Sequence, residues 1–209
     1  MKKMCLILLL LFSCRMALFS QEQLFREKAP DKFSVRFETS RGIFDAEILR
    51  DLSPLGVDRF WQLVNHRFFD NALFYRVVPN FVAQFGNTDS AELRKWVKNK
   101  VPDEKVAGSN LKGTISYARD GKDTRGEEMF INLKDNLRLD TTNYQGVRGF
   151  PVIGKVTAGM DVVESLFSVY GDKTMEKLDL MYLNRKKFLE QFYGLDSIKK
   201  AFIINNSQK

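Results

Sequence analysis

Histidine and cysteine are scarce in this sequence, and their scarcity excludes several kinds of site. Among 209 residues there is one histidine, His66, and there are two cysteines, Cys5 and Cys14. A single histidine excludes a multi-histidine metal site and leaves few ways to build a Ser-His or Cys-His nucleophile. Beyond residue 14 the sequence has no cysteine, so disulfide bonds and thiol chemistry are excluded there. Composition therefore argues against most hydrolase mechanisms.

Charge of one sign is not concentrated anywhere in the sequence. The chain has 33 lysines and arginines against 26 acidic residues, which gives a net charge of +7. The basic residues are spread among the acids, and their one tight cluster is at residues 185–187. Scattered charge makes no continuous electrostatic footprint. We therefore expect an ordinary solvated surface and no nucleic-acid partner.

A long hydrophobic run is also lacking, because the apolar run near the N-terminus is short. Lys2 and Lys3 precede an uncharged run of eleven residues, Met4 to Cys14. A transmembrane helix needs about 20 residues, whereas this length fits the core of a signal peptide. The segment can be processed in two ways, by cleavage after Ser20 or by lipidation of Cys14. We assign residues 1–20 to a signal segment, ending at Cys14 in a lipoprotein, and residues 21–31 to a short tether.

Short strands dominate the pattern that follows. Apolar and polar residues alternate from Phe33 to Glu38, as in a half-buried strand, and a turn at 40–42 predicts a hairpin with residues 43–49. Ser53-Pro54 has the pattern of a helix start with Ser53 as N-cap, and a second helix is expected after Gly159. Residues 32–170 are therefore predicted to be mainly β, a closed antiparallel β-barrel capped by two helices.

The last part of the chain, residues 171–209, has a different pattern. A stripe of apolar residues predicts one helix from about residue 174 to residue 193, and residues 201–204 have the pattern of a strand. We assign 171–209 to a C-terminal helical extension packed on the barrel. The alternative is a module that binds a partner.

One short stretch carries the chemistry. If residues 73–78 and 81–84 are adjacent strands, Arg76 and Gln84 face a common surface with Phe81 beside them. Taken singly, a strand arginine is usually a surface charge and a strand phenylalanine is usually core. The ordered set is more specific than its members.

The stretch Phe74 to Gly86 resembles the signature of the cyclophilin family, peptidyl-prolyl cis-trans isomerases. Phe74, Arg76, Val77, Pro79, Phe81, Gln84 and Gly86 match it. The segments 113–118, 130–133, 139–140, 152–156 and 159–163 resemble later family motifs in the same order. The resemblance covers roughly residues 33–168 and implies a cyclophilin-like barrel with a groove for proline-containing peptides.

The resemblance also implies roles for individual residues. Arg76 is expected to donate a hydrogen bond to the proline nitrogen, and Gln84 to hold the substrate backbone with Phe81 beside it. These three form the expected catalytic set. The expected substrate-binding residues are Val82, Ala118, Glu128, Phe130, Leu139 and Phe150. The family's chemistry needs no cofactor and no metal.

Several positions depart from the family pattern. Tyr75 stands where the family has a histidine, and we expect this position to have a supporting role. Arg138 stands where many members have a tryptophan, which predicts weak binding of cyclosporin. Glu128 falls where the family has an amide, and we expect that it could pair with Arg76 and compete with the substrate. The other departures are Phe85, Asn87, Glu127, Met129 and Phe150.

Three hypotheses follow for the function. The leading one is an isomerase acting on Xaa-Pro bonds of exported proteins and assisting their folding. The second is a catalytically weak module that binds proline-containing peptides, which Glu128 favours. The third is a surface lipoprotein that uses the barrel as a scaffold. We expect a monomer in contact with the membrane only through a lipid at Cys14, and a periplasmic or membrane-anchored location if the host is bacterial.

Overall fold

The computed structural model describes residues 25–88 and 90–204, and most of their regular structure is β-strand. All the strand pairs are antiparallel. The strands are β1 (Lys32–Thr39), β2 (Ile43–Leu49), β3 (Phe74–Val78), β4 (Val82–Phe85), β5 (Thr114–Tyr117), β6 (Met129–Asn132), β7 (Asn143–Tyr144), β8 (Val147–Arg148), β9 (Val152–Ala158) and β10 (Ile198–Ile204). The α-helices are α2 (Pro54–Asn65), α3 (Lys95–Lys98), α4 (Met160–Glu164), α5 (Leu178–Leu183) and α6 (Arg185–Gln191), and the 3-10 helices are η1 (Arg50–Leu52), η2 (Leu137–Asp140) and η3 (Lys173–Lys177).

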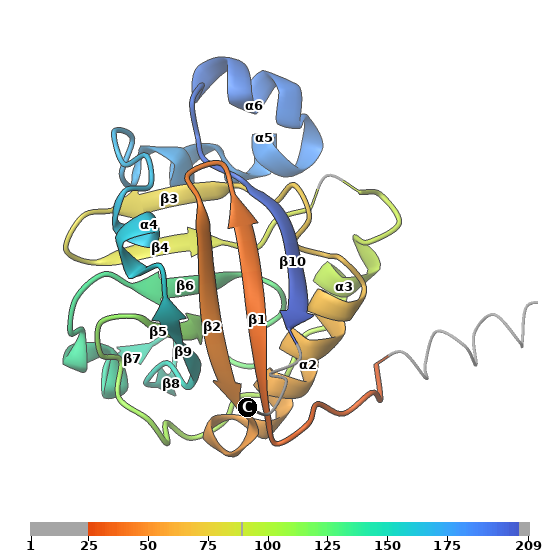
Figure 1. Ribbon diagram of the computed structural model, residues 1–209, viewed down its shortest axis with the longest axis vertical. Helices are drawn as coiled ribbons and strands as arrows, with labels where there is room; N and C mark the ends of the chain where they lie inside the picture. Colours follow the sequence, from red (N-terminus) through yellow and green to blue (C-terminus); the bar gives the residue numbers. More distant parts are fainter. Residues whose placement is uncertain (1–24, 89, 205–209) are drawn as a thin grey trace, which may run out of the picture.

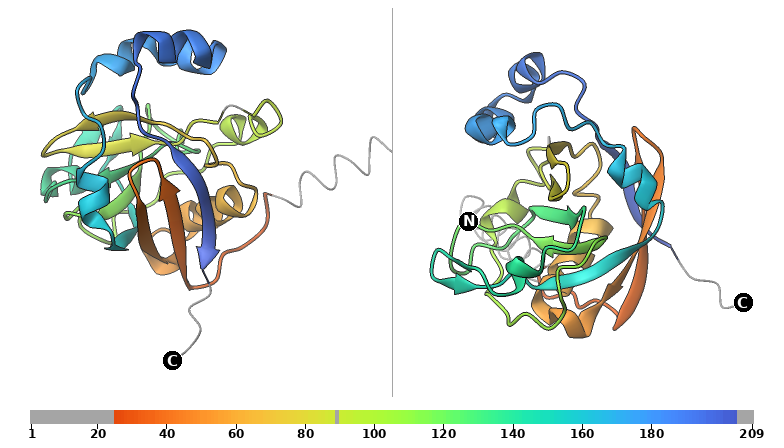
Figure 2. Two further views of the ribbon diagram at one scale, coloured as in Figure 1. Left: turned by 45° about the horizontal axis from the view of Figure 1, so that its top comes forward. Right: turned by 90° about the vertical axis from the view of Figure 1, so that its left-hand side faces the viewer.

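Eight strands form one strongly curled sheet in the order β10-β1-β2-β9-β5-β6-β4-β3, with β7 and β8 as a separate pair (Figure 1). The predicted mainly β class is confirmed, but the predicted closure of the barrel is only partial. The edge strands β3 and β10 meet at a single bridge between Leu73 and Ser197. They run apart from that point because β10 leaves the bridge along β1 (Figure 2).

Aromatic side chains fill the space inside the curled sheet. The alternation predicted for β1 buries Phe33, Val35 and Phe37, because successive side chains of a strand point to opposite faces. Phe37 stacks on Phe44 of β2 with ring centroids 4.6 Å apart. Helix α2 closes this core with its apolar face, and Phe60 at its centre is fully buried. The core thus fixes the strands on which the site is built.

The start of α2 differs from the sequence prediction. Ser53 makes no side-chain capping hydrogen bond. The carboxylate of Glu104, from a distant loop, accepts the backbone N–H groups of Leu55 at 2.8 Å and Gly56 at 3.1 Å. A carboxylate is a stronger acceptor than a hydroxyl and favours the positive end of the helix. The pattern Ser-Pro marked the boundary correctly but not the capping group.

The predicted signal segment, residues 1–20 with Cys14, lies outside the described residues, as do residues 21–24 of the predicted tether. The rest of that tether packs on the domain. The Phe25 and Trp96 rings lie 4.6 Å apart edge to face, and the Ala29 N–H donates to Asp58 at 2.9 Å. Within residues 25–88 and 90–204, no helix is long and apolar enough to cross a membrane.

Residues 170–195, which we call the helical segment, lie beyond the β3 edge of the sheet (Figure 1). The single helix predicted for residues 174–193 is instead η3, α5 and α6. Asn184 breaks it with an extended backbone, φ −152° and ψ 79°, and its side chain accepts from the Lys187 N–H at 3.0 Å to start α6. Met181 and Phe188 are buried with Leu73 and Tyr75. The segment is therefore anchored on β3.

After the helical segment the chain returns to the sheet. The extension expected to be helical over 171–209 is helical only as far as Gln191. Residues 198–204 pair with β1 as strand β10, somewhat longer than the strand predicted at 201–204. Ile198 and Ala201 are both buried although they are three residues apart, because the pairing with β1 shifts register between Glu38 and Thr39.

Candidate active site

Arg76 and Gln84 lie opposite each other on β3 and β4. The Arg76 Nη1 group donates to the Gln84 Oε1 atom at 3.0 Å, and the Gln84 Nε2 group donates to the Tyr75 hydroxyl at 2.6 Å. Neighbouring strand residues normally point to opposite faces. An irregularity in the pairing between Phe74 and Arg76, of the kind a β-bulge produces, lets both Tyr75 and Arg76 reach the same glutamine.

An apolar hollow lies next to this pair. Val82, Phe130 and Leu139 are buried together, and Phe81, Ala118 and Phe150 pack against them. The elements that supply them are β4, β6 and η2, together with the ends of β5 and the loop before β9. The structure thus brings together all the apolar residues that the sequence analysis assigned to the substrate pocket.

The hollow and the arginine belong to one groove with a volume of about 600 Å³. The Arg76 guanidinium lies 5.5 Å from the centre of the Phe81 ring, and that of Arg138 lies 4.9 Å from it. Lined by apolar rings with a few charged groups at the rim, the groove has the character of a ligand site.

Sequence reasoning missed one side of the groove. Asp172, Met175, Leu178, Asp179 and Tyr182 of the helical segment line it. They lie about a hundred residues after Arg76 in sequence, and no local pattern links them to β3. The apolar stripe that includes Leu178 and Tyr182 indicated a buried face, but it gave no signal that this face borders a site.

The partner of Arg76 differs from the expected one. Its Nε group donates to Asp172 Oδ1 at 2.6 Å, and this ion pair is partly exposed. Glu128, which we expected to pair with Arg76, accepts a hydrogen bond from the Tyr182 hydroxyl at 2.6 Å. The expectation was wrong because the helical segment supplies partners that the family motifs do not contain.

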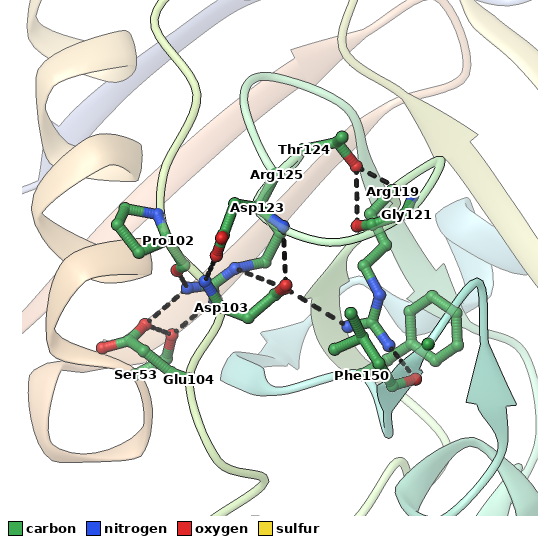
Figure 3. A network of polar contacts seen from close by, with 12 residues as sticks. Ser53, Pro102, Asp103, Glu104, Arg119, Gly121, Asp123, Thr124, Arg125 and Phe150 are labelled. Carbon is green, nitrogen blue, oxygen red and sulfur yellow. Dashed lines mark hydrogen bonds and ion pairs between the residues drawn. The ribbon is translucent and has the colours of Figure 1, made fainter.

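A buried polar network supports the floor of the groove (Figure 3). The Arg119 guanidinium lies 4.4 Å from the centre of the Phe150 ring and donates to the Val147 carbonyl at 3.0 Å. Its pKa is lowered by burial. Asp103 lies 3.8 Å from Arg119 and 3.9 Å from Arg125. The loops that carry Asp103 and Arg119 therefore hold Phe150 in place at the floor of the groove.

Burial also shifts the pKa values of acidic groups near the groove. Burial raises the pKa of Glu127 to about 7, although Lys100 at 3.0 Å opposes the shift. Burial, together with the nearby Glu128 carboxylate, raises the pKa values of Tyr75 and Tyr182 above their ordinary value. Both phenols thus stay protonated and can donate at neutral pH. Among the described residues, no group of three or more His, Cys, Asp or Glu side chains could hold a metal ion.

A strongly curled antiparallel sheet that holds an arginine–glutamine pair beside an apolar hollow defines a protein of the cyclophilin type. The family described as "Cyclophilin type peptidyl-prolyl cis-trans isomerase/CLD" matches residues 34–184. The chain therefore belongs to this family.

Relatives and solved structures agree with this assignment. A peptidyl-prolyl cis-trans isomerase of Acinetobacter baylyi is 31% identical over 137 residues, covering 65% of this chain and 72% of the relative. Peptidyl-prolyl cis-trans isomerase A of Dickeya dadantii is 36% identical over 137 residues, covering 65% and 71%. The predicted enzyme class, peptidyl-prolyl cis-trans isomerase, is thus confirmed by family and relatives.

The fold is that of solved cyclophilins. A cyclophilin type peptidyl-prolyl cis-trans isomerase of Cryptosporidium parvum superposes with a TM-score of 0.61 at 18% identity, covering 84% of this chain and 99% of that one. The same protein solved in the presence of the dipeptide Ala-Pro gives a TM-score of 0.59 at 19% identity, covering 83% and 99%. At this identity the likeness concerns the fold.

Proposed function

We propose that this protein catalyses rotation about Xaa-Pro bonds in exported proteins and so assists their folding. The observation that carries the proposal is the place of Arg76, at the rim of an apolar hollow of suitable character for a proline ring. The relative solved with the dipeptide Ala-Pro is consistent with a proline-containing ligand in a groove of this fold.

The reaction requires little from the protein beyond this placement of Arg76. Rotation about the bond has a barrier of about 18–20 kcal/mol because twisting removes the amide resonance. In the twisted state the proline nitrogen regains a lone pair, so a donor aimed at it stabilises the transition state more than the ground state. The permanently charged guanidinium of Arg76 is a strong donor. We assign the catalytic role to Arg76, backbone binding to Gln84, and the proline pocket to Phe81, Val82, Phe130, Leu139 and Phe150.

The remaining assignments belong to the same proposal. Ala118 borders the groove where the residue before proline would lie, and Glu128 contributes to the wall as a hydrogen-bond acceptor. We propose a monomer that acts on proline-containing polypeptides without a cofactor.

A second function has one observation in its favour. The Asp172 carboxylate is already paired with Arg76 at 2.6 Å, and it would compete with a substrate that needed the same charge. In that case the groove would hold proline-containing peptides with weak catalysis.

The test is a proline-isomerisation assay on the purified protein, beside Arg76→Ala. Arg94→Ala removes an exposed arginine that does not line the groove and serves as the matched control. We expect catalysis by the wild type and a loss of at least about tenfold in Arg76→Ala, equivalent to about 1.4 kcal/mol of transition-state stabilisation. A folded wild type that is no faster than buffer across several Xaa-Pro peptides would favour the binding function.

Export rests on the sequence of the first twenty residues, Lys2 and Lys3 before an uncharged apolar run. We propose a periplasmic or lipid-anchored location if the host is bacterial, with lipid attached only at Cys14. Labelling with a lipid precursor in the wild type and in Cys14→Ala separates the two. Label that depends on Cys14 indicates the anchor, and a chain that starts at Gln21 indicates cleavage after Ser20. A full-length chain that keeps residues 1–20 would contradict export.

A further inference from the structure

Two groups of the helical segment lie at the two ends of a hydrogen-bonded chain through the catalytic pair. At one end, Asp172 accepts from the Arg76 Nε group at 2.6 Å. Arg76 Nη1 donates to Gln84 Oε1 at 3.0 Å, and Gln84 Nε2 donates to the Tyr75 hydroxyl at 2.6 Å. Gln84 and Tyr75 are buried, so water cannot easily replace the bond between them, whereas the Asp172 side chain is 66% exposed.

The chain continues from Tyr75 to the other end. Glu128 lies close enough to the Tyr75 hydroxyl to raise the pKa of this phenol, by its charge and by a side-chain hydrogen bond, and Glu128 Oε1 accepts from the Tyr182 hydroxyl at 2.6 Å. Tyr182 belongs to α5 and Asp172 lies just before η3, so the helical segment contacts both ends. Met181, next to Tyr182, is buried against Leu73 and Tyr75, which fixes the position of the tyrosine.

The Glu128 carboxylate at one end and the Arg76 guanidinium at the other require the same direction for the bonds between them. A carboxylate can only accept, and a phenol has one proton to donate. The Tyr75 proton therefore goes to Glu128, and the Tyr75 oxygen is left to accept from the Gln84 amide nitrogen. The Gln84 carbonyl then faces Arg76, which can only donate. An amide at position 128 could also donate to Tyr75, which would leave Arg76 alone to fix the orientation of Gln84.

The result is a guanidinium held by two of its donors. Nε–H is held by Asp172 and Nη1 by Gln84, and the remaining N–H groups stay available for a ligand. Holding a catalytic group in its working geometry before the substrate arrives removes part of the cost of reaching the transition state.

We propose that the helical segment completes the catalytic site, with Asp172, Glu128 and Tyr182 acting as positioning residues that fix Arg76. This inference rests on the proposed isomerase function. It assigns a purpose to two departures from the family signature together, because Tyr75 and Glu128 form consecutive links of the same chain.

The decisive variant is Tyr182→Phe, which removes one hydroxyl and does not touch Arg76. Tyr193→Phe, in the same segment and 75% exposed, is the matched control. Isomerase kcat and KM are measured with an Ala-Pro peptide, together with the NMR signal of the Arg76 Nε–H group without peptide. We expect Tyr182→Phe to lower kcat about fivefold with little change in KM, which is the rate equivalent of about one hydrogen bond, and to shift or broaden the Arg76 signal.

Variants at Glu128 and Asp172 test the other links of the hydrogen-bonded chain. Glu128→Gln, which introduces the amide of the family, is expected to lower kcat by a similar factor, and Tyr182→Phe combined with Glu128→Gln is expected to be no worse than Glu128→Gln alone. Asp172→Glu is expected to recover more activity than Asp172→Asn. Melting temperatures within a few degrees of the wild type show that each variant is folded.

The outcomes separate this inference from the proposed function. Rates and Arg76 signals equal to those of Tyr193→Phe would overturn the positioning role. Faster catalysis in Tyr182→Phe or Asp172→Asn would also overturn it, because the segment would then obstruct the groove. A change in KM alone would reduce Tyr182 to part of the groove wall. If the wild type shows no isomerase activity, the proposed function fails, and the Arg76 signal in Tyr182→Phe still decides whether the chain positions the arginine.

Discussion

The two sides of the groove are built in different ways. One side consists of β4, β6 and η2, whose side chains Val82, Phe130 and Leu139 belong to the curled sheet and its loops. The other consists of the helical segment, which is attached to β3 through its own cluster around Met181 and Phe188. The sheet side shares the core of the domain, whereas the segment side has a small core of its own.

The two sides therefore supply different kinds of groups to the groove. The sheet side supplies the apolar hollow and the pair of Arg76 and Gln84, all of which lie in stretches that the family motifs cover. The segment side supplies charged and hydroxyl groups, Asp172 and Tyr182, that contact those residues from outside the sheet. A side with its own core can change its stability or its contacts without unfolding the sheet side, and the following predictions test that separation.

The largest effect is expected from Phe188→Ala, which removes a fully buried ring from the cluster of the helical segment. Loss of a buried phenylalanine typically costs about 3–5 kcal/mol. We expect faster amide hydrogen exchange in residues 173–192, while exchange in β5 changes little. Leu183→Ala, at a residue 83% exposed, is the control. Equal acceleration in β5 would mean that the two sides unfold as one unit.

An intermediate effect is expected from Glu127→Gln on the sheet side. The pKa of Glu127 is raised from 4.5 to about 7 by burial, so the native state binds this proton more tightly than the unfolded state. The stability from this group is complete below pH 4.5 and is lost as the pH rises through 7, by at most about 3 kcal/mol. The glutamine stays neutral, so its advantage over the wild type should grow between pH 5 and pH 8.

Denaturant unfolding at several pH values measures this advantage. Glu92→Gln, at an exposed position, should follow the wild type throughout. A constant difference between Glu127→Gln and the wild type from pH 5 to pH 8 would show that Glu127 is already ionised at the lower pH and would contradict the prediction.

The smallest effect is expected from Arg119→Lys beneath the groove. Lysine keeps the charge but loses the planar contact with Phe150 at 4.4 Å and the fork that reaches the Val147 carbonyl. A contact of this kind contributes about 0.5–1 kcal/mol, so kcat/KM should fall about threefold. The loss should appear in KM, because Phe150 lines the pocket and does not touch the reacting bond. An unchanged KM would show that the floor does not need this support.

Much of the sheet side could be predicted from the sequence, for a physical reason. Alternation at Phe33, Val35 and Phe37 reports which face of a strand is buried, and the spacing of Arg76 and Gln84 follows from pairing two short strands across a tight turn. These relations are local in the chain. The apolar pocket residues were found through a motif whose order along the chain reflects the same strands.

The other side could not be predicted because its contacts are long-range. Nothing near Asp172 in sequence indicates that it lies 2.6 Å from Arg76, and the length of the chain between them leaves that meeting to tertiary packing. The prediction of Ser53 as the cap of α2 was wrong for the same reason, since the carboxylate of Glu104, 51 residues from Ser53, takes its place. The break at Asn184 was missed because a continuous apolar stripe is equally consistent with one helix or two.

The position of β10 late in the sequence also has a consequence for folding. Strand β1 pairs with β2 across a short turn, but its other edge pairs with residues 198–204, which lie far away in the sequence. An unpaired strand edge invites contact with other chains, and pairing across such a separation is slow to form. The first hairpin therefore keeps one unpaired edge until residues 198–204 are available to pair with β1. Asp172 and Tyr182 arrive only shortly before β10, so the complete site around Arg76 is a late product of folding.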